Sequence, residues 1–348
     1  MLKITPTILA AVPDGDNGKI GLILELCETP AGRQTPFPAE RASLRRFVKT
    51  MDWNTAIRIL HHIGSGIPLF LAAIAALVLA RFVFVRTTSF TADAELFDNP
   101  NPAYAIAFGG FLLGAGLALS GTFFGGREED GLDAVAKLLV EGALVVALLR
   151  LSVLINDHFI LGSFCITKEI SEDRNLGGGF CVAGSSLACG VILNGAMTGY
   201  SRGFAQGLRD TILFWLVAQL ALTLACAIYR KTMRYDVHRL IEYDDNTAVG
   251  VGFGGFLVGM GIVLRSALLH SGAGSLGSEL VISGFLALLA AALLVSVNKL
   301  VLWLLFPRAD YEDEVELNGN AAVAIVAAGA MIAAALFLAS IVQRLPPQ

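Results

Sequence analysis

Residues 108–116 have the sequence FGGFLLGAG, and residues 253–261 repeat it as FGGFLVGMG. Each stretch begins seven residues after an asparagine. Four asparagines recur with a constant separation of 145 positions, which pairs Asn101 with Asn246 and Asn175 with Asn320. A match of this length and phase indicates an internal duplication. We therefore expect two copies of one unit, each containing two of these asparagines.

The composition places the two units in a membrane. Of the 348 residues, 55% are hydrophobic and only 16% are charged, whereas about a quarter of the residues in a soluble domain are charged. Eight apolar runs are long enough to cross a bilayer, which takes about 20 residues as a helix. None of the runs alternates with a period of two, so an all-α integral membrane protein is expected. The runs are residues 66–85, 102–125, 134–155, 177–198, 211–229, 247–269, 281–306 and 321–342.

The even-numbered runs carry a stripe of small residues. Each of these runs follows an acidic stretch and one of the four asparagines. The second, sixth, ninth and thirteenth residues after each asparagine are small in fifteen of sixteen cases, and this spacing places them on one helix face. Because small faces let helix backbones approach in lipid, we expect the even helices to form a packed centre inside a lipid-facing shell of odd helices. The glycines predicted to pack the helices are Gly110, Gly114, Gly184, Gly255, Gly259 and Gly329.

The number of spans sets the relative orientation of the two units. Each unit holds four spans, so the second unit enters the membrane in the same direction as the first. The expected architecture is eight transmembrane helices in two parallel four-helix repeats, at residues 64–204 and 205–348. Parallel repeats are related by an axis along the membrane normal, which distinguishes them from inverted repeats.

Two segments are expected before the first span. Residues 1–40 are predicted to be a loosely structured arm. Residues 41–63 are predicted to be a basic amphipathic helix on the membrane surface, with Leu44 and Phe47 on one face and Arg45 and Arg46 beside them. The eight Lys and Arg residues of these segments favour a cytoplasmic amino terminus, although basic residues also follow the odd-numbered spans.

Several classes of function are excluded by what the sequence lacks. The net charge of −4 supplies no basic surface for nucleic acid. The five cysteines form no CxxC pair, so neither a disulfide framework nor a thiolate metal site is implied. HExxH, GxSxG and Walker motifs do not occur. We therefore expect no enzymatic activity, no catalytic residue, no metal and no cofactor.

Five polar residues remain as candidates for an ion pathway. Glu141 lies about seven residues inside the third span, where an ionised carboxylate costs about 2.5–3.5 kcal/mol. A pair with Lys137, one turn away, is an alternative explanation for this glutamate. The four asparagines are good helix N-caps, and capping alone explains them. With the acidic residues before them, they could also ring one mouth of a pathway and gather cations. These candidates are Glu141, Asn101, Asn175, Asn246 and Asn320.

The chain resembles the YjfL-like family of bacterial inner-membrane proteins, also called domain of unknown function 350. The resemblance covers about residues 66–342 and is strongest in HRLIEYDDNTAVGVGFGGFLVGMGIVL and YEDEVELNGNAAVAIVAAGAMIAAALFL. The fourth span departs from the family pattern, because NLGGGFCVAGSS replaces an alanine-rich start. The resemblance implies two tandem family units and a location in the bacterial inner membrane, spanning it several times. It implies no established activity and only an association with membrane-stress gene sets.

Two functional hypotheses follow. In the first, the parallel units enclose a channel or carrier path for an inorganic ion or a small polar solute, lined by the even helices. In the second, the protein is a non-transporting membrane scaffold or an accessory protein in a membrane-stress response. The partners expected are the lipid bilayer and a membrane-associated protein, and the sequence also allows an oligomer.

Overall fold

The computed structural model describes residues 11–14, 19–22, 53–88, 91–124, 132–160, 168–198, 203–269 and 275–344. The chain divides into two compact units, residues 1–69 and 70–348. The first unit contains an antiparallel hairpin of β1 (Ala11–Asp14) and β2 (Lys19–Leu22). The predicted arm at residues 1–40 therefore includes a region of regular structure, which its lack of a long apolar pattern did not reveal.

The first long helix, α2, runs from Trp53 to Thr87 with Pro68 inside it. The helix continues through Gly64 and Gly66, across the boundary predicted after residue 63 between a surface helix and the first span. Proline is tolerated in membrane helices, where neighbouring groups satisfy the carbonyl that it leaves unpaired. Residues 41–52 of the predicted surface helix lie outside the described residues.

The described chain contains eight helices long and apolar enough to cross a membrane, as the sequence predicts. The even-numbered spans begin within a residue of the predicted positions, because each starts at its asparagine. The odd-numbered spans begin earlier than predicted, since their first turns are helical although they are polar. The helices after α2 are α3 (Pro102–Phe124), α4 (Leu132–Phe159), α5 (Leu176–Met197), α6 (Phe204–Thr232), α8 (Thr247–Leu268), α9 (Leu276–Leu305) and α11 (Ala321–Val342).

A short helix precedes each even-numbered span. These helices occupy the connections that the sequence shows only as acidic stretches. They are η1 (Ala94–Asp98) and η2 (Lys168–Glu172), which have π-helical hydrogen bonding, and the α-helices α7 (Val237–Glu242) and α10 (Tyr311–Glu316). Because α3, α5, α8 and α11 all start after such a connection, the four connections lie at the same end of four parallel helices.

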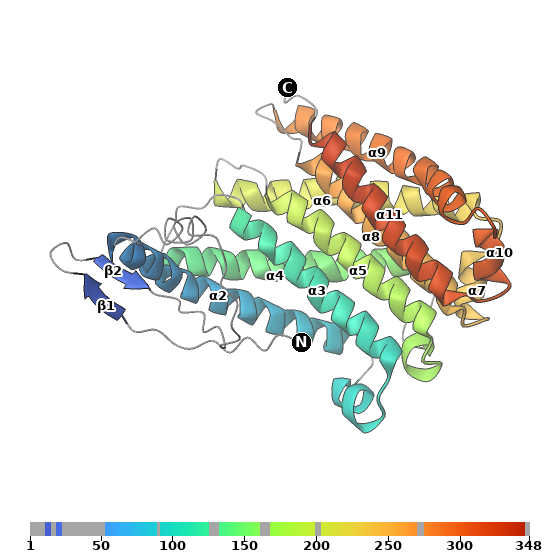
Figure 1. Cartoon of the computed structure of the whole chain (residues 1–348), viewed down its shortest axis with the longest axis horizontal. Helices are drawn as coiled ribbons and strands as arrows, with labels where there is room; N and C mark the ends of the chain where they lie inside the picture. Colours follow the sequence, from blue (N-terminus) through green and yellow to red (C-terminus); the bar gives the residue numbers. More distant parts are fainter. Residues whose placement is uncertain are drawn as a thin grey trace, which may run out of the picture. The chain divides into compact units, whose positions relative to one another are not determined.

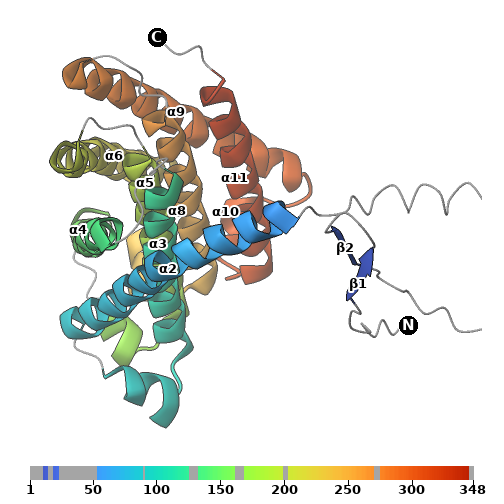
Figure 2. The ribbon, with the colours of Figure 1, turned by 90° about the vertical axis from the view of Figure 1, so that its left-hand side faces the viewer.

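The second, fourth, sixth and eighth spans are α3, α5, α8 and α11, which we call the even helices. They lie side by side in this order (Figure 1). On one side of this row, α4, α6 and α9 form a second layer (Figure 2). The row is open at both ends, so the predicted packed centre is correct only for its two middle members. The buried share of the apolar stretch is 78% in α5 and 83% in α8, but only 28% in α11. An end helix has a neighbour in the row on one side only. The last span, α11, is therefore more exposed than α4 and α6, which are the third and fifth spans.

Side-chain packing repeats with the duplication. Phe84 of α2 packs against Phe108 and Phe111 of α3, with both ring-centroid distances 5.1 Å. The equivalent residues 145 positions later are Tyr229 of α6 and the pair Phe253 and Phe256 of α8, at 5.5 and 4.1 Å. The two units therefore use one packing scheme for their first helix pair.

Candidate functional site

The asparagines that start the even helices cap those helices. The side-chain oxygen of each one accepts a hydrogen bond from the backbone N–H three residues later. The donors are Tyr104, Gly178, Val249 and Val323, at 3.1, 2.9, 3.1 and 3.3 Å. The capping explanation offered by the sequence is therefore present at all four positions.

The amide nitrogens of the first three asparagines also join neighbouring helix pairs. Nδ2 of Asn101 donates to the backbone oxygen of Ile170 in η2 at 2.7 Å. Nδ2 of Asn175 donates in the same way to Ile241 of α7, and that of Asn246 donates to Val315 of α10 at 2.9 Å. Each acceptor lies five residues before the next asparagine. The asparagines therefore form a repeated junction between successive helix pairs, a role that sequence spacing alone does not show.

A carboxylate six residues earlier accepts a hydrogen bond from three of the four asparagines. Nδ2 of Asn101 donates to Glu95, that of Asn175 to Glu169 and that of Asn320 to Glu314, at 2.8, 3.2 and 2.9 Å. Glu169 is only 1% exposed. Burial raises the pKa of its carboxyl group, and the hydrogen bond from Asn175 opposes this rise.

The raised pKa of Glu169 predicts a pH-dependent stability. The folded chain holds this proton more tightly than the unfolded chain, so stability falls as the pH rises from about the ordinary value of 4.5 to the raised pKa. Above the raised pKa, the loss is complete. Glu169→Gln can still accept from Asn175 without a buried charge, so we expect it to melt at a higher temperature than wild type at pH 7. Thermal melting in detergent from pH 4 to pH 7 checks this, and equal slopes for both proteins would contradict it.

The backbone just before three of the asparagines is left-handed. Arg174, Asp245 and Gly319 have φ values of 54°, 48° and 57°. Glycine adopts this conformation at no steric cost, whereas other L-residues lose about 1–2 kcal/mol. The tight turns from η2, α7 and α10 into the next span therefore favour glycine at this position.

This turn provides a matched pair of substitutions. Asp245→Gly is expected to stabilise the protein by about 0.5–1 kcal/mol, and Gly319→Ala is expected to destabilise it by about 1 kcal/mol. Thermal melting of the two purified variants in the same detergent measures whether the stability of each rises or falls relative to wild type. A loss of stability in Asp245→Gly would show that its side chain, rather than its backbone, matters at the turn.

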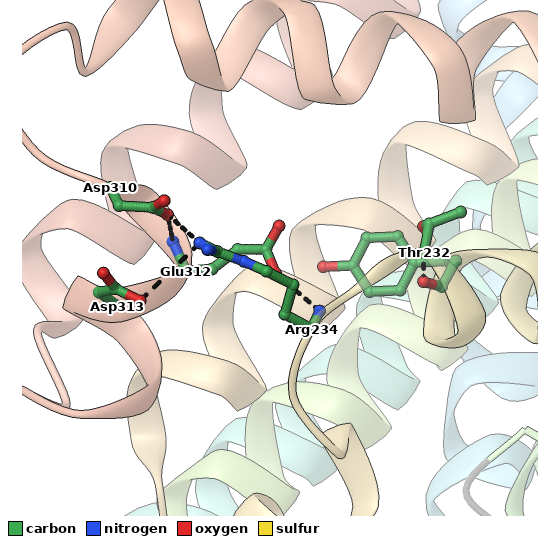
Figure 3. A network of polar contacts seen from close by, with 6 residues as sticks. Thr232, Arg234, Asp310, Glu312 and Asp313 are labelled. Atoms are coloured by element: carbon green, nitrogen blue, oxygen red, sulfur yellow. Dashed lines mark hydrogen bonds and ion pairs between the residues drawn. The ribbon is translucent and has the colours of Figure 1, made fainter.

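An exposed ion-pair network joins the last two connections (Figure 3). The guanidinium group of Arg234, before α7, contacts the carboxylates of Asp310, Glu312 and Asp313 around the start of α10 at 2.5, 3.2 and 3.8 Å. The hydrogen bond from Arg234 lowers the pKa of Asp310. Because the network is in water, it orients the connections more than it stabilises them.

The small-residue stripe brings helix backbones into contact. A Cβ built on Gly110 would lie 2.5 Å from the Cα of Ala183, and one built on Gly184 would lie 2.6 Å from the Cα of Gly254. The predicted packing glycines Gly114, Gly255 and Gly259 also face the next helix in the row, toward Ser186, Ala328 and Met331. Gly329 does not: a Cβ there would meet nothing within 4 Å. Gly329 has no packing partner among the described residues because α11 is the last helix of the row.

Glu141 is not near the asparagines. It is 4% exposed in the first half of α4, about 27 Å along the helix from Phe159, where α4 reaches the end that carries the asparagines. The amino group of Lys137, offered as its partner, contacts Asp133 at 2.8 Å. The structure therefore does not bring the five candidate pathway residues together.

Comparison with known families gives the assignment. The family model for Domain of Unknown Function (DUF350) matches residues 58–197 and again residues 203–342. The chain belongs to the DUF350 family. Its two DUF350 units are tandem, as the resemblance implies, and they begin and end within seven residues of the predicted repeats. No curated protein and no solved structure matches the chain.

The two DUF350 units meet through α5 and α8, whose contact uses the same small positions as the contacts within each unit. A polar cluster whose partners the sequence does not show lies beside this contact. Nε1 of Trp215 in α6 donates to Ser152 of α4 at 2.7 Å, and Nε2 of Gln219 donates to Asn156 at 2.5 Å. Nδ2 of Asn156 donates in turn to Ser185 of α5 at 2.6 Å. In the sequence, these residues stand out only as polar residues inside apolar runs. That signal does not show which of them form hydrogen bonds with each other.

Proposed function

We propose that this multi-pass DUF350 protein is a non-transporting membrane scaffold that binds other proteins at one end of its helix row. The packing of the even helices carries this proposal. Along α3, α5 and α8, the glycines Gly110, Gly184 and Gly255 lie so close to the backbone of the next helix that an added methyl group does not fit. A layer packed in this way supports attached groups rigidly and leaves no room between these helices for a hydrated ion.

The end with the asparagines offers a surface for such binding. We call residues 91–101, 168–175, 233–246 and 307–320 the acidic end. These segments hold about half of the chain's 29 acidic residues and only a fifth of its 25 basic ones. Three large apolar side chains on this surface, Phe97, Tyr243 and Leu317, are each 75% exposed. Exposed apolar side chains surrounded by charge are typical of protein interaction surfaces, so a partner with a basic surface fits this end.

For the location, we propose the bacterial inner membrane with the amino terminus in the cytoplasm. The basic residues before the first span support this orientation. It would place the acidic end on the opposite side of the membrane, because α2 crosses before η1 begins. A reporter enzyme that is active only outside the cytoplasm, fused after residue 245, is expected to be active. Activity only in a fusion after residue 270 would reverse the orientation.

Site-specific photo-crosslinking tests the scaffold. A photoreactive amino acid replaces Tyr243 in the full chain, and cells are irradiated before their membranes are isolated. We expect an adduct with a different protein, and we expect the triple variant Asp98→Asn, Glu172→Gln and Asp244→Asn to reduce its yield. Neutralising Asp133, Asp210 and Glu279, near the starts of the odd helices, is the matched control and should leave the adduct unchanged.

A flux measurement separates the scaffold from the transport hypothesis. Purified protein in liposomes is expected to pass K⁺, Na⁺, Cl⁻ and protons no faster than empty liposomes. Flux that depends on Glu141 would overturn the scaffold proposal in favour of transport. Absence of any adduct at Tyr243, together with absence of flux, would also reject binding at the acidic end.

A further inference from the structure

Each even helix has two different contact faces. We call the second, sixth, ninth and thirteenth residues after each asparagine the forward face, and the fourth, eighth, eleventh and fifteenth the backward face. Wherever two even helices are neighbours, the forward face of the earlier one packs on the backward face of the later one. Gly110 faces Ala183, Gly184 faces Gly254, and Gly255 faces Ala328. One interface is therefore repeated three times along the row.

Among the described residues, the first and last members of the row each have one of these faces without a neighbouring even helix. On α3 the backward face is Ala105, which is exposed, and Gly109, Leu112 and Gly116, which are half-buried; a Cβ on either glycine would meet nothing within 4 Å. On α11 the forward face is Ala322, Val326, Gly329 and Ala333, in which Val326 is 55% exposed and Gly329 meets nothing. The equivalent faces of α5 and α8 are buried. The two uncovered faces are thus the two complementary halves of the repeated interface.

The asparagine junction is also incomplete at the two ends of the row. Nδ2 of Asn101, Asn175 and Asn246 each reaches a backbone oxygen in the following helix pair. Within the described part of the chain, Nδ2 of Asn320 donates only to Glu314, and its amide carries a second N–H. The matching acceptor position at the start of the row is the backbone oxygen of Leu96, five residues before Asn101. The last unit therefore carries a donor, and the first unit carries the equivalent acceptor position.

We propose that copies of this chain associate head to tail in the membrane, with α11 of one copy packing on α3 of the next as α3 packs on α5. Continuity of the interface favours a second copy over another partner, because both halves are present on one chain in the required register. Glycine destabilises a helix by about 0.8–1.0 kcal/mol relative to alanine. On a face that contacts only lipid, no helix contact offsets this loss. Against a second helix, glycine permits the close contact that drives association in lipid.

The symmetry of this contact has a consequence for the assembly. The two faces are different, so the contact is heterologous and each added copy leaves the same two faces uncovered at the ends. Such contacts produce a closed ring when the rotation between copies closes and an open row when it does not. This association goes beyond the proposed scaffold function and does not depend on a partner at the acidic end.

Cysteine cross-linking in native membranes tests the proposal. Within the chain, the residue thirteen positions after one asparagine faces the residue eleven positions after the next, as Gly114 faces Ser186 and Gly259 faces Met331. The pair to test is therefore Ala333→Cys in one copy with Leu112→Cys in a second, differently tagged copy. Both positions already carry a side chain, so the new cysteines leave the close glycine contacts unchanged. Oxidation is expected to produce a mixed dimer when the two are co-expressed. A chain carrying both cysteines should give a ladder of larger species or a single closed ring.

Controls separate this geometry from others. Leu113→Cys with Phe337→Cys pairs residues that are 64% and 73% exposed but lie off the two faces, and it should give no mixed dimer. Gly329→Leu is expected to abolish the cross-link between Ala333→Cys and Leu112→Cys. Dimers of Ala333→Cys alone or Leu112→Cys alone would indicate a symmetric contact and overturn the head-to-tail arrangement. Absence of any cross-link, with all variants inserted at wild-type levels, would reject self-association through these faces.

Discussion

Replacing Gly184 with alanine is expected to reduce the stability of the protein by about 2–3 kcal/mol. The added methyl group would lie 2.6 Å from both the Cα and the carbonyl oxygen of Gly254, so two backbones must separate. Backbone atoms cannot rotate aside as a side chain can. The separation would weaken the contact between α5 and α8, which joins the two DUF350 units. Thermal melting in detergent, followed by the fluorescence of Trp215 at the same unit boundary, measures the loss.

Gly277→Ala is the matched control for this substitution. Gly277 lies in the first turn of α9, and a Cβ built on it meets nothing within 4 Å. Alanine favours a helix over glycine, so this variant should be unchanged or more stable by up to about 1 kcal/mol. Equal stability of Gly184→Ala and Gly277→Ala would mean that α5 and α8 are not in backbone contact.

Replacing Asn175 with aspartate is expected to cost about 3 kcal/mol, although aspartate is as good an N-cap as asparagine. The new oxygen can still accept from Gly178, but it cannot donate to Ile241 or Glu169. It would instead place a second acceptor beside a carboxylate and a carbonyl in a site where Asn175 is 2% exposed. The experiment therefore separates the junction from the cap.

Asn320→Asp is the control, because Asn320 caps α11 but donates to no following helix pair in the described chain. We expect it to cost about 1 kcal/mol in dilute detergent, where copies are separate. Unfolding midpoints of the two variants, measured together over a range of pH, give the comparison. Equal losses would show that the bond from Asn175 to Ile241 contributes nothing beyond capping.

The parts of the fold that could be predicted from sequence depend on local signals. The starts of α3, α5, α8 and α11 were predictable because asparagine caps a helix at a defined residue. The starts of the odd helices were not, since the apolar run that marks the membrane core is shorter than the helix that contains it. The connections look only acidic in the sequence, and their helical turns form because each packs at the start of an even helix.

The candidate site was predictable only in part. The sequence identifies the four asparagines and offers capping, but the bond of Asn101 to Ile170 joins residues that are 69 positions apart. The hydrogen bonds of Asn156 with Ser185 and Gln219 likewise need three helices, α4, α5 and α6, brought together. Glu141 stands out in the sequence because burying a carboxylate is costly, yet its position in α4 separates it from the asparagines.

The sequence by itself determined the membrane location, the eight spans, the duplication and the faces that could pack closely, because hydropathy, helical period and small side chains are local properties. Only the tertiary structure decided how those faces combine. Two different faces on each helix produce an open row rather than a closed cluster, since the forward face of one helix fits the backward face of the next. Among the described residues, that asymmetry leaves Gly329 at one end and Gly109 at the other without a neighbouring helix.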